Sequence, residues 1–426
     1  MKLRTILRTL LTLIIVVSGY FNQAFAQEID IILKGGQLID PKNKIDAKMD
    51  VGITNGKISQ IAPDIAAARA KKVVDVKGLV ISPGLIDIHV HVFAGTNLKQ
   101  QYMDGPNSLA PDGFTFRSGV TTVVDAGSSG WKTFPLFKKN IIDQSKTRVL
   151  AFLNIVGDGM GEHQQDKNDM DPMMAATFAK YYKNDIVGFK VAHFGGAQSI
   201  PVDSAVAAGK LANVPVMVDW RGLPPENSLE QLFMKHLRPG DIFTHNFHAG
   251  KGAGANAAVY KESLVDVSTG KVRPFVFKAQ QRGIVMDVGH GANGFVFSQA
   301  IPAIQQGLLP NSISSDLHIA NMNAGMKDMA NIMSKFLNMG IPLKDVVRLS
   351  TWNPAMYIKR TELGHLSVGA EADIAVFRVR TGEFGFFDAH GGYLKGTQKL
   401  ETELTLRAGK IEWDLNGIGT TKLGTN

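Results

Sequence analysis

Through the middle of the chain, short apolar runs rich in Val, Ile and Leu alternate with loops and helix-forming segments. Runs of this kind are typical of parallel strands buried on both faces, and eight of them with helical connections predict an α/β fold, a (β/α)8 TIM-like barrel. An open doubly wound sheet is the alternative, but no Gly-rich phosphate loop follows the first strand. The eight expected strands are Val80–His91, Val120–Asp125, Val149–Val156, Ile186–Val191, Val214–Asp219, Asp241–His245, Gly283–Gly289 and Ser312–Asp316. Helices are expected at Met173–Lys183, Ala205–Ala212 and Asp328–Met339.

The two ends of the chain lack this alternation. Between Glu28 and about Val80, and again over roughly Gly364 to Trp413, the sequence reads as short strands separated by turns such as Asn55-Gly56. Both flanks are therefore expected to be β-rich.

The first 26 residues have the composition of a cleaved secretory signal. A basic start that includes Lys2 and Arg4 precedes the apolar run Leu10–Val17, and Ala24-Phe25-Ala26 is a small-x-small end. An uncleaved anchor is the alternative. The expectation is an exported protein, periplasmic or secreted, with no membrane association once residues 1–26 are removed.

Composition limits the partners and the chemistry. Removing residues 1–26 takes away three basic side chains and no acid, so the formal net charge falls from +8 to +5. No run of Lys and Arg is interleaved with aromatic residues, so no nucleic-acid partner is expected. The chain has no cysteine, so it has no disulfide, no thiolate metal site and no cysteine nucleophile.

The first expected barrel strand ends in two histidines, His89 and His91. Residues two apart on a strand point to the same face, so both imidazoles can reach one divalent metal at roughly 2.0–2.1 Å. An isolated His-x-His can equally cap a strand without binding metal. The rest of the chain favours the metal, because other strands also end in ligand-type or polar residues: Lys190, Asp219, His245, His290 and Asp316. In a barrel, the C-terminal ends of the strands meet at one pocket.

Several motifs of the chain resemble the amidohydrolase superfamily, most closely its dihydroorotase and D-aminoacylase side and the deacetylase-type metallohydrolases. They extend over essentially the whole mature chain: Pro83-Gly-Leu-Ile-Asp-Ile-His-Val-His91, Gly119-Val-Thr-Thr-Val-Val-Asp125, Arg238-Pro-Gly-Asp-Ile-Phe-Thr-His245, Lys271-Val-Arg-Pro274, Asp287-Val-Gly-His-Gly291, Ser315-Asp-Leu-His318, Asn353-Pro-Ala355 and Gly369-Ala-Glu-Ala-Asp-Ile-Ala-Val-Phe377. The resemblance implies a metal-dependent hydrolase barrel over residues 83–357. It also implies a small β-sandwich built from residues 27–82 and 358–426.

Carried over position by position, the resemblance makes His89, His91 and Asp316 ligands of a buried metal and His245 a ligand of a second, more exposed one. Lys190 would be the bridging lysine, carboxylated by carbon dioxide to a carbamate. An ordinary salt-bridging lysine is the alternative. The expected metal is Zn²⁺, one or two ions per chain.

Asp219 is the departure from the family pattern, which usually has a histidine on the fifth strand. A carboxylate can still bind zinc, but its charge weakens the Lewis acid, and harder ligands also admit Mn²⁺ or Fe²⁺. A single tightly bound metal is the alternative. His193 or His248 could replace the missing histidine, and His163 could line the pocket.

The expected chemistry is hydrolysis of an amide or ester in a small molecule, with Asp316 as the general base for a metal-activated water. His290, Arg221 and His193 are the expected substrate contacts. Cyclic-amide hydrolysis and deamination are alternatives with the same metals. A catalytically silent binding protein is the alternative from another class, since Asp219 replaces a standard ligand. Substrate identity is not predicted, and a homo-oligomer is compatible with the sequence.

Overall fold

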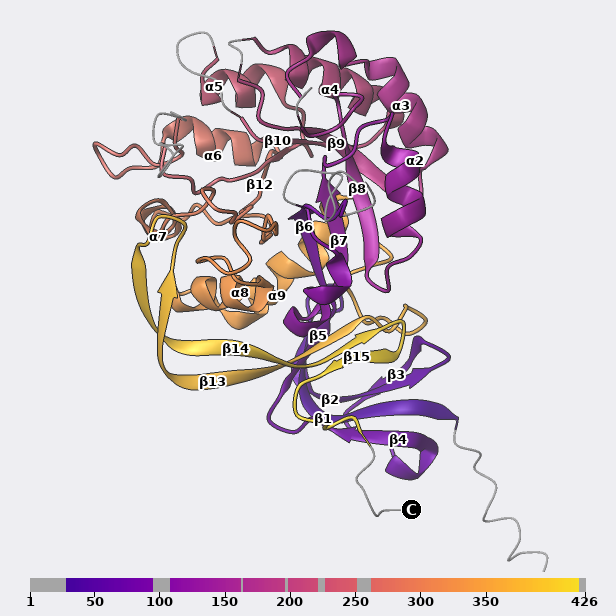
Figure 1. The fold of residues 1–426 in the computed structure, drawn as a ribbon. Coiled ribbons are helices and arrows are strands. Elements are labelled where there is room, and N and C mark those ends of the chain that lie inside the picture. Colours follow the sequence, from indigo (N-terminus) through magenta and orange to yellow (C-terminus); the bar gives the residue numbers. More distant parts are fainter. Residues whose placement is uncertain are drawn as a thin grey trace, which may run out of the picture.

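The computed structural model of the protein describes residues 28–94, 108–161, 164–195, 198–220, 227–250 and 262–420. The expected signal segment 1–26, Arg221 and His163 lie outside the described residues. Two sheets organise the rest, a curled parallel sheet surrounded by helices and a separate, largely antiparallel sheet (Figure 1). The expected α/β class with a barrel and a second β unit is confirmed. Among the described helices, none has both the length and the apolar character needed to cross a bilayer.

The parallel sheet contains seven consecutive strands in sequence order, from β6 to β12. The strands are β6 Leu85–Val90, β7 Val120–Ala126, β8 Arg148–Asn154, β9 Ile186–Val191, β10 Val216–Val218, β11 Ile242–Phe243 and β12 Val285–Met286. Apart from the first residue of β8, every residue of these strands is buried, because the sheet is covered on both faces.

The expected eighth strand, Ser312–Asp316, is not a regular strand. This segment makes isolated parallel bridges instead, Asp287 with Ser312 and Val90 with Leu317. It therefore touches both edges of the seven-stranded sheet and closes the ring. Asp316, at the end of the segment, has a φ of 52°, in the left-handed region, which a continuous strand does not allow past this residue.

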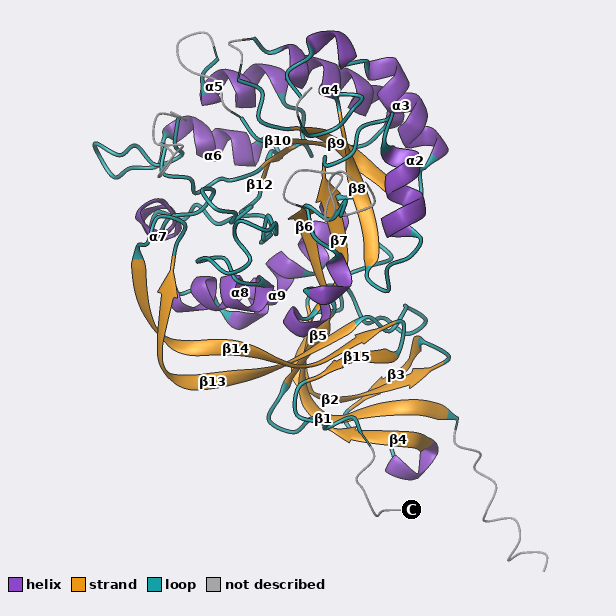
Figure 2. Ribbon diagram, viewed as in Figure 1, coloured by secondary structure: helices purple, strands orange, loops and turns teal. Residues whose placement is uncertain are grey.

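The helices lie mainly between successive strands, as expected for a barrel (Figure 2). Ala175 of α3 and Val202 of α4 pack on the face that carries Val216 and Val218, whereas Ala355 of α10 packs with the opposite face. The helix bounds are α2 Phe134–Phe137, α3 Pro172–Tyr181, α4 Ile200–Ala212, α5 Leu229–Gln231, α6 Pro274–Gln281, α7 Phe297–Gln305, α8 Met329–Asn338, α9 Leu343–Ser350 and α10 Trp352–Tyr357.

Both ends of the chain contribute to the second sheet. Its order is β15-β14-β13-β5-β1-β2-β3, and β4 pairs with β1 outside this path. The junction between the two ends is the antiparallel pairing of β5 with β13. The strands are β1 Ile29–Asp40, β2 Ile45–Thr54, β3 Lys57–Ala62, β4 Ala70–Asp75, β5 Val80–Pro83, β13 Ile374–Phe387, β14 Tyr393–Arg407 and β15 Lys410–Asp414.

The long hairpin of β13 and β14 leaves this sheet and extends beneath α8 toward α7 (Figure 1). The tip of the hairpin is attached there by two hydrogen bonds. The Asp388 carboxylate accepts from Phe297 N at the start of α7 (2.9 Å), and Ala389 N donates to Phe295 O (3.0 Å). A segment from the C-terminal flank thus reaches the C-terminal ends of the barrel strands.

Candidate metal centre

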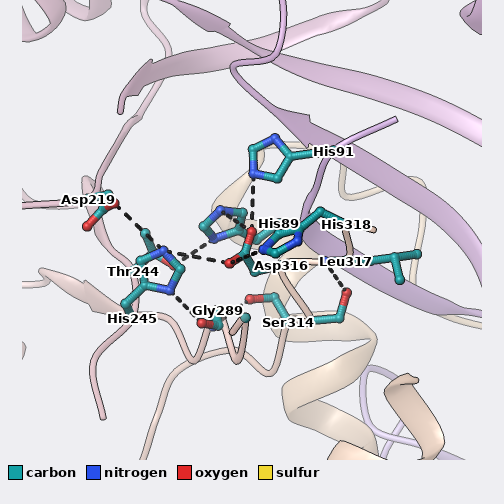
Figure 3. Close-up of polar contacts among 12 residues, drawn as sticks. His89, His91, Asp219, Thr244, His245, Gly289, Ser314, Asp316, Leu317 and His318 are labelled. Atoms are coloured by element: carbon teal, nitrogen blue, oxygen red, sulfur yellow. Dashed lines mark hydrogen bonds and ion pairs between the residues drawn. The ribbon is translucent and has the colours of Figure 1, made fainter. Parts of the chain in front are cut away.

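Three predicted metal ligands come together at the mouth of the curled sheet. His89 lies near the end of β6, His91 follows it, and Asp316 lies in the segment that closes the ring; all three are buried (Figure 3). Asp316 Oδ1 is 3.1 Å from His91 Nε2 and 3.4 Å from His89 Nε2. One ligand atom from each residue lies within 4.8 Å of the other two. A single cation can therefore be held by all three.

The charge states of this cluster suit a cation. Burial, reinforced by the nearby Lys190, lowers the pKa of His89 well below its usual value, so the imidazole is neutral and has a free lone pair. Burial alone would raise the pKa of Asp316, but the neighbouring His89 and His318 hold it well below its ordinary value. Imidazole nitrogens and a carboxylate oxygen are among the ligands that zinc sites use.

A buried hydrogen-bond chain orients His89. Thr244 Oγ1 lies 2.8 Å from His89 Nδ1 and donates to Asp287 Oδ2, also at 2.8 Å. Because the threonine proton goes to the carboxylate, its oxygen can only accept from His89 Nδ1–H. This arrangement fixes the tautomer that leaves Nε2 free for a metal.

His91 has a similar support on the adjacent strand. Its Nδ1 lies 3.0 Å from Ser128 Oγ, just after β7. Asp125, at the end of β7, accepts from Ser128 N (2.7 Å) and from Val92 N (2.8 Å). A buried acid therefore ties the two strand ends together next to the ligand.

Lys190 projects from β9 into the same cluster and is 1% exposed. Its Nζ lies 3.1 Å from His89 Nε2 and 3.6 Å from Met217 Sδ. The predicted carbamate position is thus adjacent to the metal-facing nitrogen of His89.

Asp219 and His245 form a second group beside the first. His245 Nε2 is 3.9 Å from Asp219 Oδ2 and 4.0 Å from Asp316 Oδ2, and His193 Nε2 is 3.2 Å from Asp219 Oδ2. His245 Nδ1 lies 2.5 Å from Gly289 O, which fixes its tautomer as well. This group is looser than the first, and both the one-metal and the two-metal site stay predictions. The structure brings His193 close to Asp219, and its role as a substrate contact stays a prediction.

Three residues of the site have a left-handed backbone: His193 (φ 47°), His245 (φ 58°) and Asp316 (φ 52°). Each such conformation costs a non-glycine residue about 1–3 kcal/mol and persists only where the surroundings enforce it. These backbone conformations fix the directions in which the three side chains leave the main chain at the barrel mouth.

His290, predicted to contact substrate, is completely buried. Its Nε2 is 2.7 Å from Lys335 Nζ and its Nδ1 is 3.0 Å from Gly291 O, so both ring nitrogens are engaged within the protein. The predicted substrate contact would require one of these bonds to open. His248 is also buried, and its Nδ1 accepts from Gly250 N at 3.1 Å.

His318, the last residue of the Ser315-Asp-Leu-His318 motif, is a site residue for which the sequence predicts no role. Its Nε2 is 3.7 Å from Asp316 Oδ2, and its ring centroid is 6.1 Å from that of His91 (Figure 3). Burial lowers its pKa, so the ring is neutral. Asp316 and His318 are two positions apart, as are His89 and His91, so the same spacing could have predicted that His318 lies at the site.

This geometry defines a class of protein, a metal-dependent hydrolase built on a curled parallel sheet with its ligands at the strand ends. The comparisons agree with it. The amidohydrolase family profile matches residues 297–402. A deacetylase of Brucella anthropi is 35% identical over 81% of this chain and 83% of its own length, and a deacetylase of Agrobacterium fabrum is 34% identical over 79% and 80%.

Solved structures give the same result. An adenine deaminase has a TM-score of 0.78 and 26% identity, covering 91% of this chain and all (100%) of its own. A dihydroorotase has a TM-score of 0.75 and 29% identity, covering 89% of this chain and 98% of its own. The chain belongs to the amidohydrolase family.

Proposed function

We propose that the protein hydrolyses the acyl–nitrogen or acyl–oxygen bond of a small molecule, in the manner of a deacetylase or aminoacylase. The observation that carries this proposal is the buried cluster of His89, His91 and Asp316, with Lys190 Nζ 3.1 Å from His89 Nε2. The similarity of this chain to two deacetylases, over about four fifths of its length, supports an acyl substrate.

A divalent metal bound at this cluster lowers the pKa of water toward neutrality and polarises a carbonyl oxygen. Asp316, whose pKa is held well below its ordinary value, would accept the proton of the attacking water. It then returns that proton to the leaving amine or alcohol. His318, beside the second oxygen of Asp316, limits the directions in which the carboxylate can turn.

We propose Zn²⁺ as the metal and a carbamate on Lys190. The buried imidazole donors suit zinc, and a lysine at the edge of a cationic centre is favoured in its neutral, nucleophilic form. Carbon-13 spectroscopy of enzyme incubated with labelled bicarbonate tests the carbamate, which gives a carbonyl signal that Lys190→Ala loses.

The function is tested by metal analysis together with turnover of a panel of chromogenic esters and N-acetyl amino acids. The expected result is at least one zinc per chain and turnover of one substrate class, both abolished by a chelator and restored by Zn²⁺. Full zinc content without turnover on a broad acyl panel would overturn the proposal in favour of a binding protein.

A second candidate is hydrolysis of a cyclic amide or deamination. It is favoured by the structural similarity to a dihydroorotase and an adenine deaminase over about nine tenths of this chain. Adding dihydroorotate, hydantoins and adenine to the panel separates it from the first, because the metals are the same and only the substrate differs.

Export is proposed on the sequence of residues 1–26 alone. N-terminal sequencing of the protein from its native host tests it: a mature chain that begins near residue 27, recovered outside the cytoplasm, is expected. A cytoplasmic chain that begins at Met1 would contradict it.

A further inference from the structure

A tight turn of Gly289, His290 and Gly291, here called the glycine turn, lies against the predicted metal ligands. A Cβ atom on Gly289 would lie 2.3 Å from Thr244 Oγ1, and one on Gly291 would lie 2.2 Å from Asp316 Oδ2. Both glycines have positive φ, 46° and 52°. The turn therefore fits this place only with glycine at both ends, and any displacement of it moves ligand side chains.

The glycine turn also bonds directly to the site. Gly289 O accepts from His245 Nδ1 at 2.5 Å, and Gly291 N donates to Ser315 O at 2.9 Å, next to Asp316. The position of the turn thus sets the direction of the His245 ring and supports the backbone of Asp316.

Lys335, on α8, holds the other side of this turn. Three acceptors lie within hydrogen-bond distance of its Nζ: His290 Nε2 (2.7 Å), Gly325 O (2.6 Å) and Phe387 O (2.6 Å). The residue is 0% exposed, and no carboxylate in the described chain forms a salt bridge with it. The rings of Phe295 and Phe297 lie 5.6 and 5.9 Å from Nζ.

A buried lysine without a carboxylate partner is costly, and a methionine of similar length would fill the same space. The contacts of Lys335 join three separate segments: the glycine turn, the loop at Gly325 and the tip of the β13–β14 hairpin. We propose that Lys335 is a positioning residue, which fixes the glycine turn through His290 and so holds His245 and Asp316 in the geometry that binds the metal. The β13–β14 hairpin contributes to this positioning, because Phe387 O at its tip accepts a hydrogen bond from Lys335 Nζ.

The inference rests on the proposed function only through the metal, so the test measures Zn²⁺ binding without substrate. Lys335→Met is compared with Asn338→Ala on the same helix. Asn338 also ties α8 to the hairpin, since its side chain donates to Gln398 O (2.7 Å) and accepts from Thr397 N (2.8 Å), but it does not contact the glycine turn.

Calorimetric titration of metal-free protein with Zn²⁺ should give a dissociation constant at least about tenfold higher for Lys335→Met, the usual scale for an outer-shell partner. Asn338→Ala should lower the melting temperature and leave the Zn²⁺ affinity within about twofold of wild type. The visible spectrum of the Co²⁺ form should change in Lys335→Met alone, because it reports the arrangement of ligands rather than stability.

His290→Ala breaks the same link from its other end and serves if Lys335→Met does not fold. It should weaken Zn²⁺ binding by a similar factor. In a double variant the two losses should not add, because both substitutions remove one contact. The positioning role of Lys335 would be overturned, and the proposed function would stand, if folded Lys335→Met or His290→Ala kept wild-type Zn²⁺ affinity and an unchanged Co²⁺ spectrum. A wild type that binds no Zn²⁺ would overturn both the proposed function and this inference.

Discussion

The hydroxyl of Thr244 gives the sharpest test of how the metal site is built. Replacing it by Val keeps the shape of the side chain and removes one atom that contacts both His89 Nδ1 and Asp287 Oδ2, each at 2.8 Å. Thr244 is 1% exposed and Asp287 is completely buried, so water does not replace the hydroxyl. The ring of His89 then loses the acceptor that fixes its tautomer.

Two independent magnitudes can be compared for this change. A buried donor left without a partner costs about 1–3 kcal/mol. Loss of an outer-shell partner of a ligating histidine typically lowers metal affinity about 10–100-fold, which corresponds to about 1.4–2.7 kcal/mol. The two ranges agree, so we expect Thr244→Val to weaken Zn²⁺ binding by about 10–100-fold.

The assay is competition for Zn²⁺ with a chromogenic chelator, and Ser312→Ala is the matched control. Ser312 Oγ donates to the other oxygen of Asp287 at 2.6 Å, so its loss disturbs the same carboxylate without touching His89. Ser312→Ala should keep wild-type affinity. Equal affinity of Thr244→Val and wild type, or an equal loss in Ser312→Ala, would refute the reasoning.

Three further predictions concern the site and its support. Asp316→Asn should keep most of the metal but lose at least about a hundredfold in rate, as measured by metal content and turnover, whereas a parental rate would rule out the general base. His91→Ala should lose the buried metal, which elemental analysis of the purified variant checks; unchanged metal content would disprove its assignment. Burial lowers the pKa of Lys335 from its ordinary 10.5 to about 7, so between these values the unfolded chain binds a proton that the folded chain does not. The unfolding free energy of wild type should therefore rise with pH relative to that of Lys335→Met, by at most about 1.4 kcal/mol per pH unit. Urea titrations of both proteins at about pH 7 and about pH 8.5 measure the difference between their unfolding free energies. The same difference at both pH values would contradict the lowered pKa of Lys335.

The overall architecture could be predicted because buried parallel strands leave a strong pattern. Six of the apolar runs lie where the sequence places them, whereas the first, expected over Val80–His91, divides into β5 of the other sheet and β6 of the barrel. His89 and His91 are recognised by a period of two. The backbone at the end of the eighth run could not be predicted, because no apolar pattern reveals the left-handed conformation of Asp316. The structure brings His89, His91 and Asp316 together, and the roles assigned to them stay predictions.

Other features depend on contacts that are distant in the sequence. The C-terminal flank reads as short strands separated by turns, but β13 runs from Ile374 to Phe387, through polar and exposed residues that are typical of a loop. In the same flank, a turn at Ala408 (φ 50°) and Gly409 (φ 75°) separates β14 from β15. Lys335 resembles any solvated helix lysine until the fold places it beside His290.

The hairpin also has a consequence for biosynthesis. Ribosomes add residues from the N-terminus, so Asp316 and α8 emerge before Phe387, whose carbonyl is one of the three acceptors of Lys335. A nascent or truncated polypeptide that stops before β13 therefore has every predicted ligand of the cluster but lacks part of the scaffold behind it. If Lys335 positions the site as proposed, an isolated barrel fragment should bind the metal more weakly than the full-length chain.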